Sequence, residues 1–137
     1  MTVFFSADNE FTILIGEMIE KACKRVLVAC YLLSLPFILQ KLVEKKRQGL
    51  DVRAVLGMEQ PNQASVAFLL QNGVPVKVWR RNTLHMKMIV VDNTLIVTSA
   101  NLTHYGLNQN QEIMLFTKNK DDVKKAVEYF EWLWTVS

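Results

Sequence analysis

The sequence has few cysteines and no long apolar stretch. Its 137 residues include two cysteines, Cys23 and Cys30, whereas a small disulfide-stabilised scaffold carries more of them at framework-like spacings. We therefore expect both to be free thiols. The most apolar stretch, residues 26–39, is interrupted by Ser34 and Pro36, and it is shorter than the roughly 20 residues that span a membrane. No membrane span is expected.

A strong excess of one charge and low-complexity sequence are also absent. Lys and Arg number 16 against 13 Asp and Glu, a net charge of +3, which is a mild surplus and not the strong positive charge of a protein that coats nucleic acid. With 50% hydrophobic residues, the chain is not disordered. No linker rich in Gly, Ser or Pro divides it, and no repeat is visible. We expect a single domain over residues 1–137 that buries its own core without disulfide or metal.

The first residues lack the basic region of a signal peptide. They read Met-Thr-Val-Phe-Phe-Ser-Ala-Asp. The default expectation is a cytoplasmic protein, and a periplasmic or secreted location stays open if a signal was removed.

Helical and strand-like patterns alternate along the chain. Apolar residues at helical spacing predict helices around residues 11–22, 38–43, 64–71 and 123–134, the last one capped by Asn119. Apolar or β-rich runs predict strands at residues 25–33, 51–56, 74–79, 86–91, 95–98 and 112–116. The uninterrupted apolar run at 25–33 is typical of a strand covered on both faces. The fold class is therefore α/β, a mixed sheet flanked by helices.

The residues that carry chemistry lie between 84 and 103. His85 and Lys87 are two apart in a predicted strand, so both side chains project from the same face. Such a polar pair on an apolar strand tends to mark a functional site. Ser99 and Asn101, again two apart, follow the next predicted strand.

These residue types suit phosphate chemistry. A histidine supplies a nucleophile or base near neutral pH, Lys87 supplies positive charge, and Ser99 and Asn101 supply neutral donors, which together form a phosphate-binding set without metal ligands. Glu112 follows on a later strand and is placed to orient an imidazole. From His85 and Lys87 alone, a surface strand with one satisfied histidine and one solvated lysine is an equally good interpretation.

The spacing of these residues resembles the HxKxxxxD…GSxN signature of the phospholipase D superfamily. The first part of the pattern is His85-x-Lys87-x(4)-Asp92, and the second part is Ser99-x-Asn101. The order of the flanking elements is also similar, and the chain most resembles the small bacterial endonucleases that carry a single motif.

Two departures from the signature are visible. Thr98 stands where the family usually has glycine, and the spacer between Asp92 and this position is one residue shorter than usual. A tighter hairpin accommodates the shorter spacer. The missing glycine bears on how closely the backbone approaches a phosphate, but neither departure removes a chemical group.

The resemblance implies a phosphodiesterase that needs neither metal nor cofactor. His85 would attack phosphorus to form a phosphohistidine, while Lys87, Asn101 and Ser99 hold the non-bridging oxygens. Glu112 would fix the histidine tautomer. Asp92 would brace the hairpin rather than touch substrate.

This mechanism also needs an acid for the leaving oxygen, worth roughly 10²–10⁴ in rate. The only other histidine, His104, lacks a lysine two residues later, where Gly106 stands. The simplest second source is His85 of an identical chain, so we expect a homodimer that shares one site.

The expected substrate is DNA or RNA, cleaved without strong sequence preference. Arg80 and Arg81 are candidates for flanking phosphates. In the polar loop at residues 102–110, His104 is a candidate to bind substrate, with an ordinary surface histidine as the alternative, and Tyr105 is a candidate to stack on a base. The basic run at residues 45–47 is expected on the solvated face of its helix. The alternatives are a phospholipase D or phosphatidyl transferase acting on lipid, and a catalytically weak nucleic-acid-binding module of the same fold.

Overall fold

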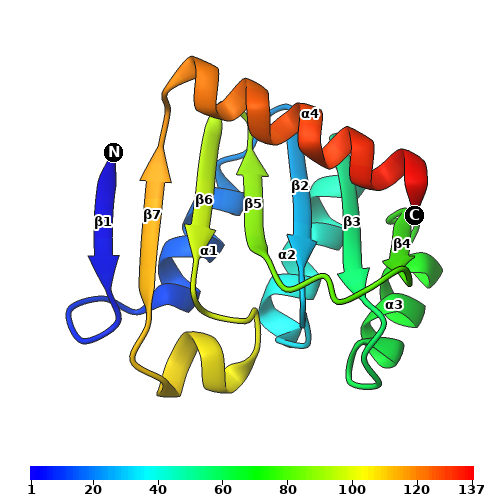
Figure 1. Ribbon diagram of the computed structural model, residues 1–137, viewed down its shortest axis with the longest axis horizontal. Coiled ribbons are helices and arrows are strands. Elements are labelled where there is room, and N and C mark those ends of the chain that lie inside the picture. Colours follow the sequence, from blue (N-terminus) through cyan, green and yellow to red (C-terminus); the bar gives the residue numbers. More distant parts are fainter.

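A seven-stranded mixed β-sheet organises the molecule, in the strand order β1-β7-β6-β5-β2-β3-β4 (Figure 1). The computed structural model describes all residues from Met1 to Ser137. The strands are β1 (Thr2–Phe5), β2 (Arg25–Cys30), β3 (Asp51–Gly57), β4 (Val76–Trp79), β5 (Lys87–Val91), β6 (Thr94–Thr98) and β7 (Ile113–Thr117). The helices are α1 (Phe11–Glu20), α2 (Pro36–Arg47), α3 (Asn62–Gln71) and α4 (Lys120–Val136), with a π-helical turn η1 (Tyr105–Gln109).

The two halves of the sheet are built differently. Strands β2, β3 and β4 are parallel and are joined through α2 and α3. The strands β5, β6, β7 and β1 add to the edge at β2, each antiparallel to its neighbour. The mixed α/β sheet expected from the sequence is confirmed.

Helices cover both faces of the sheet, with α4 alone on one face (Figure 1). Along β2, Val26 and Val28 point into the larger core, which includes α1, α2 and α3. Leu27 and Ala29 point into the smaller core beneath α4. Burial on both faces explains why this segment is apolar without interruption.

The structure differs from the sequence prediction in three places. The strand predicted at residues 25–33 ends at Cys30, because beyond Tyr31 the backbone bonds to the segment around Leu102 rather than to a strand. The N-terminal strand β1 has no counterpart in the sequence prediction and pairs with β7 at the sheet edge. The segment between β6 and β7, for which the sequence predicts neither a helix nor a strand, contains the π-helical turn η1.

Lys45 contradicts the expectation of an outward, solvated face at residues 45–47. Its side chain is buried, and Nζ donates to the carbonyl oxygens of Glu20 and Ala22 and to Oε1 of Gln48. The ammonium group thus satisfies the carbonyls at the end of α1, which explains why a lysine is buried there. The rest of the run is more exposed.

Candidate active site

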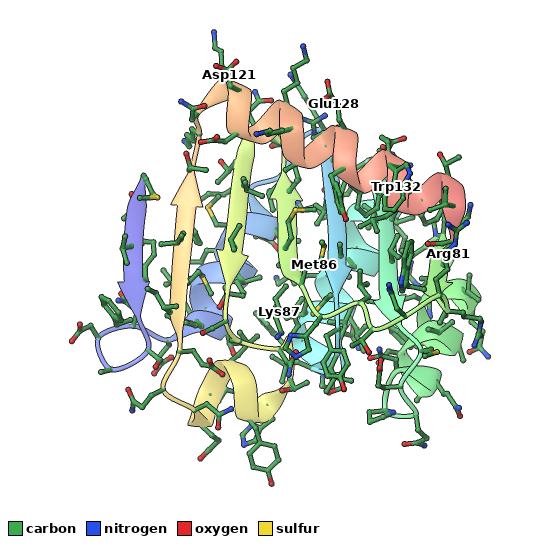
Figure 2. The ribbon with its side chains drawn as sticks, in the orientation of Figure 1. Arg81, Met86, Lys87, Asp121, Glu128 and Trp132 are labelled. Carbon is green, nitrogen blue, oxygen red and sulfur yellow. The ribbon has the colours of Figure 1, made fainter.

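The polar residues of the motif gather at one edge of the sheet, where β2 and β6 end and β5 begins (Figure 1). Lys87 is the first residue of β5, and Figure 2 shows it at this edge. His85 lies just before the strand rather than inside it, and its side chain is exposed. Lys87 Nζ is 3.3 Å from His85 Nδ1 and 3.5 Å from Nε2. The structure therefore brings the imidazole and the ammonium group together.

Tyr31 adds an aromatic ring that the sequence interpretation did not include. Its ring centroid lies 4.9 Å from that of His85, and Lys87 Nζ lies 5.9 Å from the Tyr31 centroid. Tyr31 is the first residue after β2. The sequence could have revealed Tyr31 through this position, because ligand-binding sites of α/β sheets lie at the carboxyl ends of the parallel strands.

Ser99 and Glu112 form a hydrogen-bonded pair on the side of the site toward β7. Ser99 Oγ donates to Glu112 Oε1 at 2.7 Å and accepts from the backbone N–H of Ile113 at 3.0 Å. Asn110 Nδ2 donates to the other oxygen of Glu112 at 3.4 Å. Both carboxylate oxygens therefore have partners, and neither hydrogen bond involves His85.

Asn101 is held against the turn η1. A Cβ on Gly106 would lie 2.2 Å from the carbonyl oxygen of Asn101 and 2.9 Å from its nitrogen, so only glycine allows this close approach. The side-chain Oδ1 of Asn101 is buried and has no hydrogen-bond partner. A buried acceptor without a partner costs free energy. A hydrogen-bond donor on a bound ligand could therefore pair with this oxygen.

Thr98, at the position where the family usually has glycine, is buried and fully hydrogen-bonded. Its Oγ1 donates to the carbonyl oxygen of Ile113 at 2.8 Å and accepts from the N–H of Ala100 at 3.0 Å. The threonine therefore fastens the end of β6 to β7 directly before Ser99.

Asp92 lies at the opposite end of β5, in the turn to β6. Its carboxylate accepts from the backbone N–H groups of Cys23, Lys24 and Arg25 at 2.9, 2.7 and 3.1 Å. Partial burial acts to raise the pKa of this carboxyl group, but the three N–H donors outweigh it and lower the pKa. Asp92 also adopts a positive φ of 51°. These contacts fit a brace between the β5–β6 hairpin and the start of β2.

The residues expected to bind substrate lie in two separate places. His104 and Tyr105 belong to the segment that packs on Asn101, and Tyr105 is 71% exposed. The ring nitrogens of His104 lie 3.2 and 3.3 Å from the amide nitrogens of Asn108 and Gln109.

The arginines follow β4. The Arg81 guanidinium lies 5.7 Å from the Trp79 ring, and Figure 2 places Arg81 well away from Lys87. Arg80, the neighbouring residue, is exposed.

Of the two cysteines, only Cys30 lies near this end of the sheet, and it is buried. Both cysteines are free, as expected. Cys30 pairs with Lys87 in the sheet register, but burial raises its pKa to about 11, and its Sγ lies 3.0 Å from the carbonyl oxygen of Leu32. No group of three or more His, Cys, Asp and Glu side chains is arranged to hold a metal ion. None of the helices has the length and apolar character needed to cross a bilayer.

Comparison with known proteins identifies relatives across most of the chain. The family model described as "Cardiolipin synthase, PLD-like domain" matches residues 15–134. Cardiolipin synthase 2 of Bacillus cereus is 27% identical over an alignment 124 residues long, which covers 83% of this chain and 24% of that protein. The chain thus spans about a quarter of the length of the curated relatives it matches.

Solved structures share the fold over nearly the full chain. Nuc from Salmonella typhimurium, described as a phospholipase D family member, superposes with a TM-score of 0.86 and 25% identity, covering 98% of this chain and 93% of that one. NucT from Helicobacter pylori gives a TM-score of 0.81 and 18% identity, covering 98% and 94%.

Proposed function

The chain belongs to the phospholipase D-like family, and from this premise we propose that residues 1–137 form one metal-independent phosphodiesterase domain that cleaves DNA or RNA. Family members are phosphodiesterases or phosphatidyl transferases. The observation that carries the proposal is the contact of 3.3 Å between Lys87 Nζ and His85 Nδ1 at an open edge of the sheet. A nucleophile and a fixed positive charge side by side suit attack on a phosphodiester.

The proposed reaction has two steps. An imidazole nitrogen of His85 attacks phosphorus, a P–N bond forms, and the P–O bond to the leaving group breaks as that oxygen takes a proton. Water then attacks phosphorus and returns a proton to the group that protonated the leaving oxygen, the P–N bond breaks, and a phosphomonoester leaves with His85 restored. Lys87 and Asn101 would hold the non-bridging oxygens. Ser99 would assist them, with its hydroxyl oriented by Glu112.

The proton for the leaving oxygen needs a second acid. His104 is a poor source, because the amides of Asn108 and Gln109 contact both of its ring nitrogens. We assign the proton to His85 of the partner subunit in a homodimer, where one histidine attacks while the other protonates. Each copy alone would then hold half of the catalytic pair.

An exposed apolar face offers a place for the second copy. On the α4 side of the sheet, Val97 pairs with Leu115, which pairs with Val3. Val97 and Val3 are 41% and 44% exposed, and a hollow of about 450 Å³ opens beside them next to Tyr129. Contiguous exposed apolar patches mark interaction sites. The hollow lies toward the Leu95 end of β6, whereas Val97 lies two residues before Ser99. A copy that covers β6 along its length on this face would therefore reach the half-complete site.

The dimer is tested by sedimentation at micromolar concentration. We expect Val97→Asp to produce an inactive monomer. The matched control is Ile13→Asp on α1, because Ile13 is 48% exposed and lies on the other face. The control should remain dimeric and active. A fully active wild-type monomer would contradict the shared site.

The chemistry is tested on a panel of substrates with EDTA present. Wild type and His85→Ala are incubated with single- and double-stranded DNA, RNA, phosphatidyl lipid and a chromogenic phosphodiester. We expect cleavage of nucleic acid by wild type and none by the variant. Activity that survives in His85→Ala, or that requires Mg²⁺, would refute the proposal.

A lipid substrate is the second candidate, and the cardiolipin synthase relatives favour it. In the same panel, transfer or release of a lipid headgroup without cleavage of nucleic acid would select it. Salt-dependent binding of nucleic acid without turnover would instead indicate a binding module.

A further inference from the structure

Tyr31 is fixed by its backbone at the centre of the site. Its N–H donates to the carbonyl oxygen of Met86 at 3.0 Å, the residue between His85 and Lys87. Its own carbonyl accepts from Asn62 Nδ2 at 2.8 Å, and Asn62 is buried. A Cβ on Gly57 would lie 2.7 Å from this carbonyl, so the absence of a side chain at that position permits the approach. The ring of Tyr31 therefore projects from a rigid frame.

The ring of Tyr31 lies against both His85 and Lys87. It packs against the imidazole of His85 at 4.9 Å between centroids, with an angle of 48° between the planes. Lys87 Nζ lies within cation–π range of the same ring, at 5.9 Å. The half-buried side chain of Tyr31 thus contacts both the proposed nucleophile, His85, and the positive charge of Lys87.

Little else holds His85 in place. Its ring is exposed, and its only side-chain hydrogen-bond partner is Lys87. Glu112, which sequence reasoning assigned to orient the imidazole, bonds to Ser99 and Asn110 instead. The tyrosine ring packs against the imidazole and so restricts its rotation.

We propose that Tyr31 is a positioning residue, which orients His85 and Lys87 before substrate binds. The inference rests on the proposed function, since it assigns a role within that reaction. A misplacement of about 1 Å in a reacting group can cost on the order of 100-fold in rate. Loss of the ring therefore acts on turnover more than on substrate binding.

The kinetic test compares Tyr31→Leu with Tyr31→Phe in single-turnover and steady-state assays. We expect Tyr31→Leu to lower kcat roughly 10- to 100-fold with KM within about 3-fold of wild type. Tyr31→Phe restores the ring and should recover kcat to within about 3-fold. Thermal unfolding of each variant reports whether it is folded. Equal kcat in wild type and Tyr31→Leu, or a loss confined to KM, would overturn the proposal.

A second measurement does not depend on activity. The chain has two histidines, so a carbon–proton spectrum of the imidazole rings contains two sets of signals, assigned with His104→Ala. Removal of the Tyr31 ring should shift the His85 signals, through the lost ring current, and leave the His104 signals in place. Unchanged His85 signals in Tyr31→Leu would refute the positioning role. If wild type cleaves no substrate, the proposed function fails while this spectrum still decides whether the Tyr31 ring packs against His85, which the positioning role requires.

Discussion

Substitution of Asp92 tests whether a residue of the same motif as His85 and Lys87 stabilises the fold without taking part in catalysis. Its carboxylate accepts three backbone N–H bonds, and a hydrogen bond to a charged group contributes roughly 1.5–3 kcal/mol. The amides of Cys23 and Lys24 are exposed and regain water when the carboxylate is removed, so we reduce the total to about 2–3 kcal/mol. Alanine at the positive φ of this turn adds about 1 kcal/mol of strain.

We therefore expect Asp92→Ala to lower the free energy of unfolding by about 3–4 kcal/mol, from the bonds and strain above. Asp92→Asn tolerates the backbone conformation and keeps one acceptor, so it should lose about 1–2 kcal/mol. Urea unfolding followed by tryptophan fluorescence measures both. Turnover per folded molecule should stay within about 2-fold of wild type, because Asp92 and Lys87 lie at opposite ends of β5. If an Asp92 variant kept full stability but lost turnover, the structural role of Asp92 would be refuted.

The pH dependence of this contribution has a defined sign. The pKa of Asp92 is lowered in the folded state, so the unfolded chain binds the proton more tightly. The stabilisation is fully present above the unfolded pKa of about 3.9 and is lost as the pH falls through the lower folded value. The stability difference between wild type and Asp92→Asn should shrink between neutral pH and pH values below the folded pKa. A difference independent of pH would contradict this origin.

Three further predictions concern buried polar groups. Ellman's reagent should modify exposed Cys23 in the native protein and Cys30 only after unfolding, because burial raises the pKa of Cys30 to about 11; equal native rates would contradict this. Lys45→Ala should cost about 2–3 kcal/mol in urea unfolding, because it leaves carbonyls at the end of α1 unpaired, against less than about 0.5 for Lys46→Ala. Thr98→Val should cost about 1–3 kcal/mol, since it leaves a buried N–H unsatisfied; an unchanged unfolding midpoint would refute that role.

Local patterns were sufficient to predict most of the fold. The alternation of β2 between two cores, and the cap at Asn119, whose side chain accepts from the N–H groups of Asp121 and Asp122, follow from residues close in sequence. Strand β1 was missed because its pairing partner, β7, lies more than a hundred residues away. Lys45 was misplaced because the carbonyls that bury it belong to another helix.

The site shows the same division between local and distant information. Spacing alone was enough to place His85 beside Lys87. The contact with Tyr31 depends on the register that sets Cys30 opposite Lys87, which a single sequence does not display. The partner of Glu112 is likewise fixed by pairing between β6 and β7, which brings Ser99 next to it rather than His85.

In the proposed reaction, His85 bonds covalently to phosphorus during phosphodiester cleavage, and the phosphorus keeps one ester fragment of the substrate. The most direct measurement is mass spectrometry of wild-type protein mixed with the substrate it cleaves, quenched at alkaline pH within one turnover, with EDTA present. We predict an adduct on the peptide containing His85 with the mass of the phosphoryl group and the ester fragment that it retains, absent from His85→Ala and formed and consumed at rates compatible with turnover. Cleavage that proceeds with no adduct on His85, or with the adduct on another residue, would contradict the account.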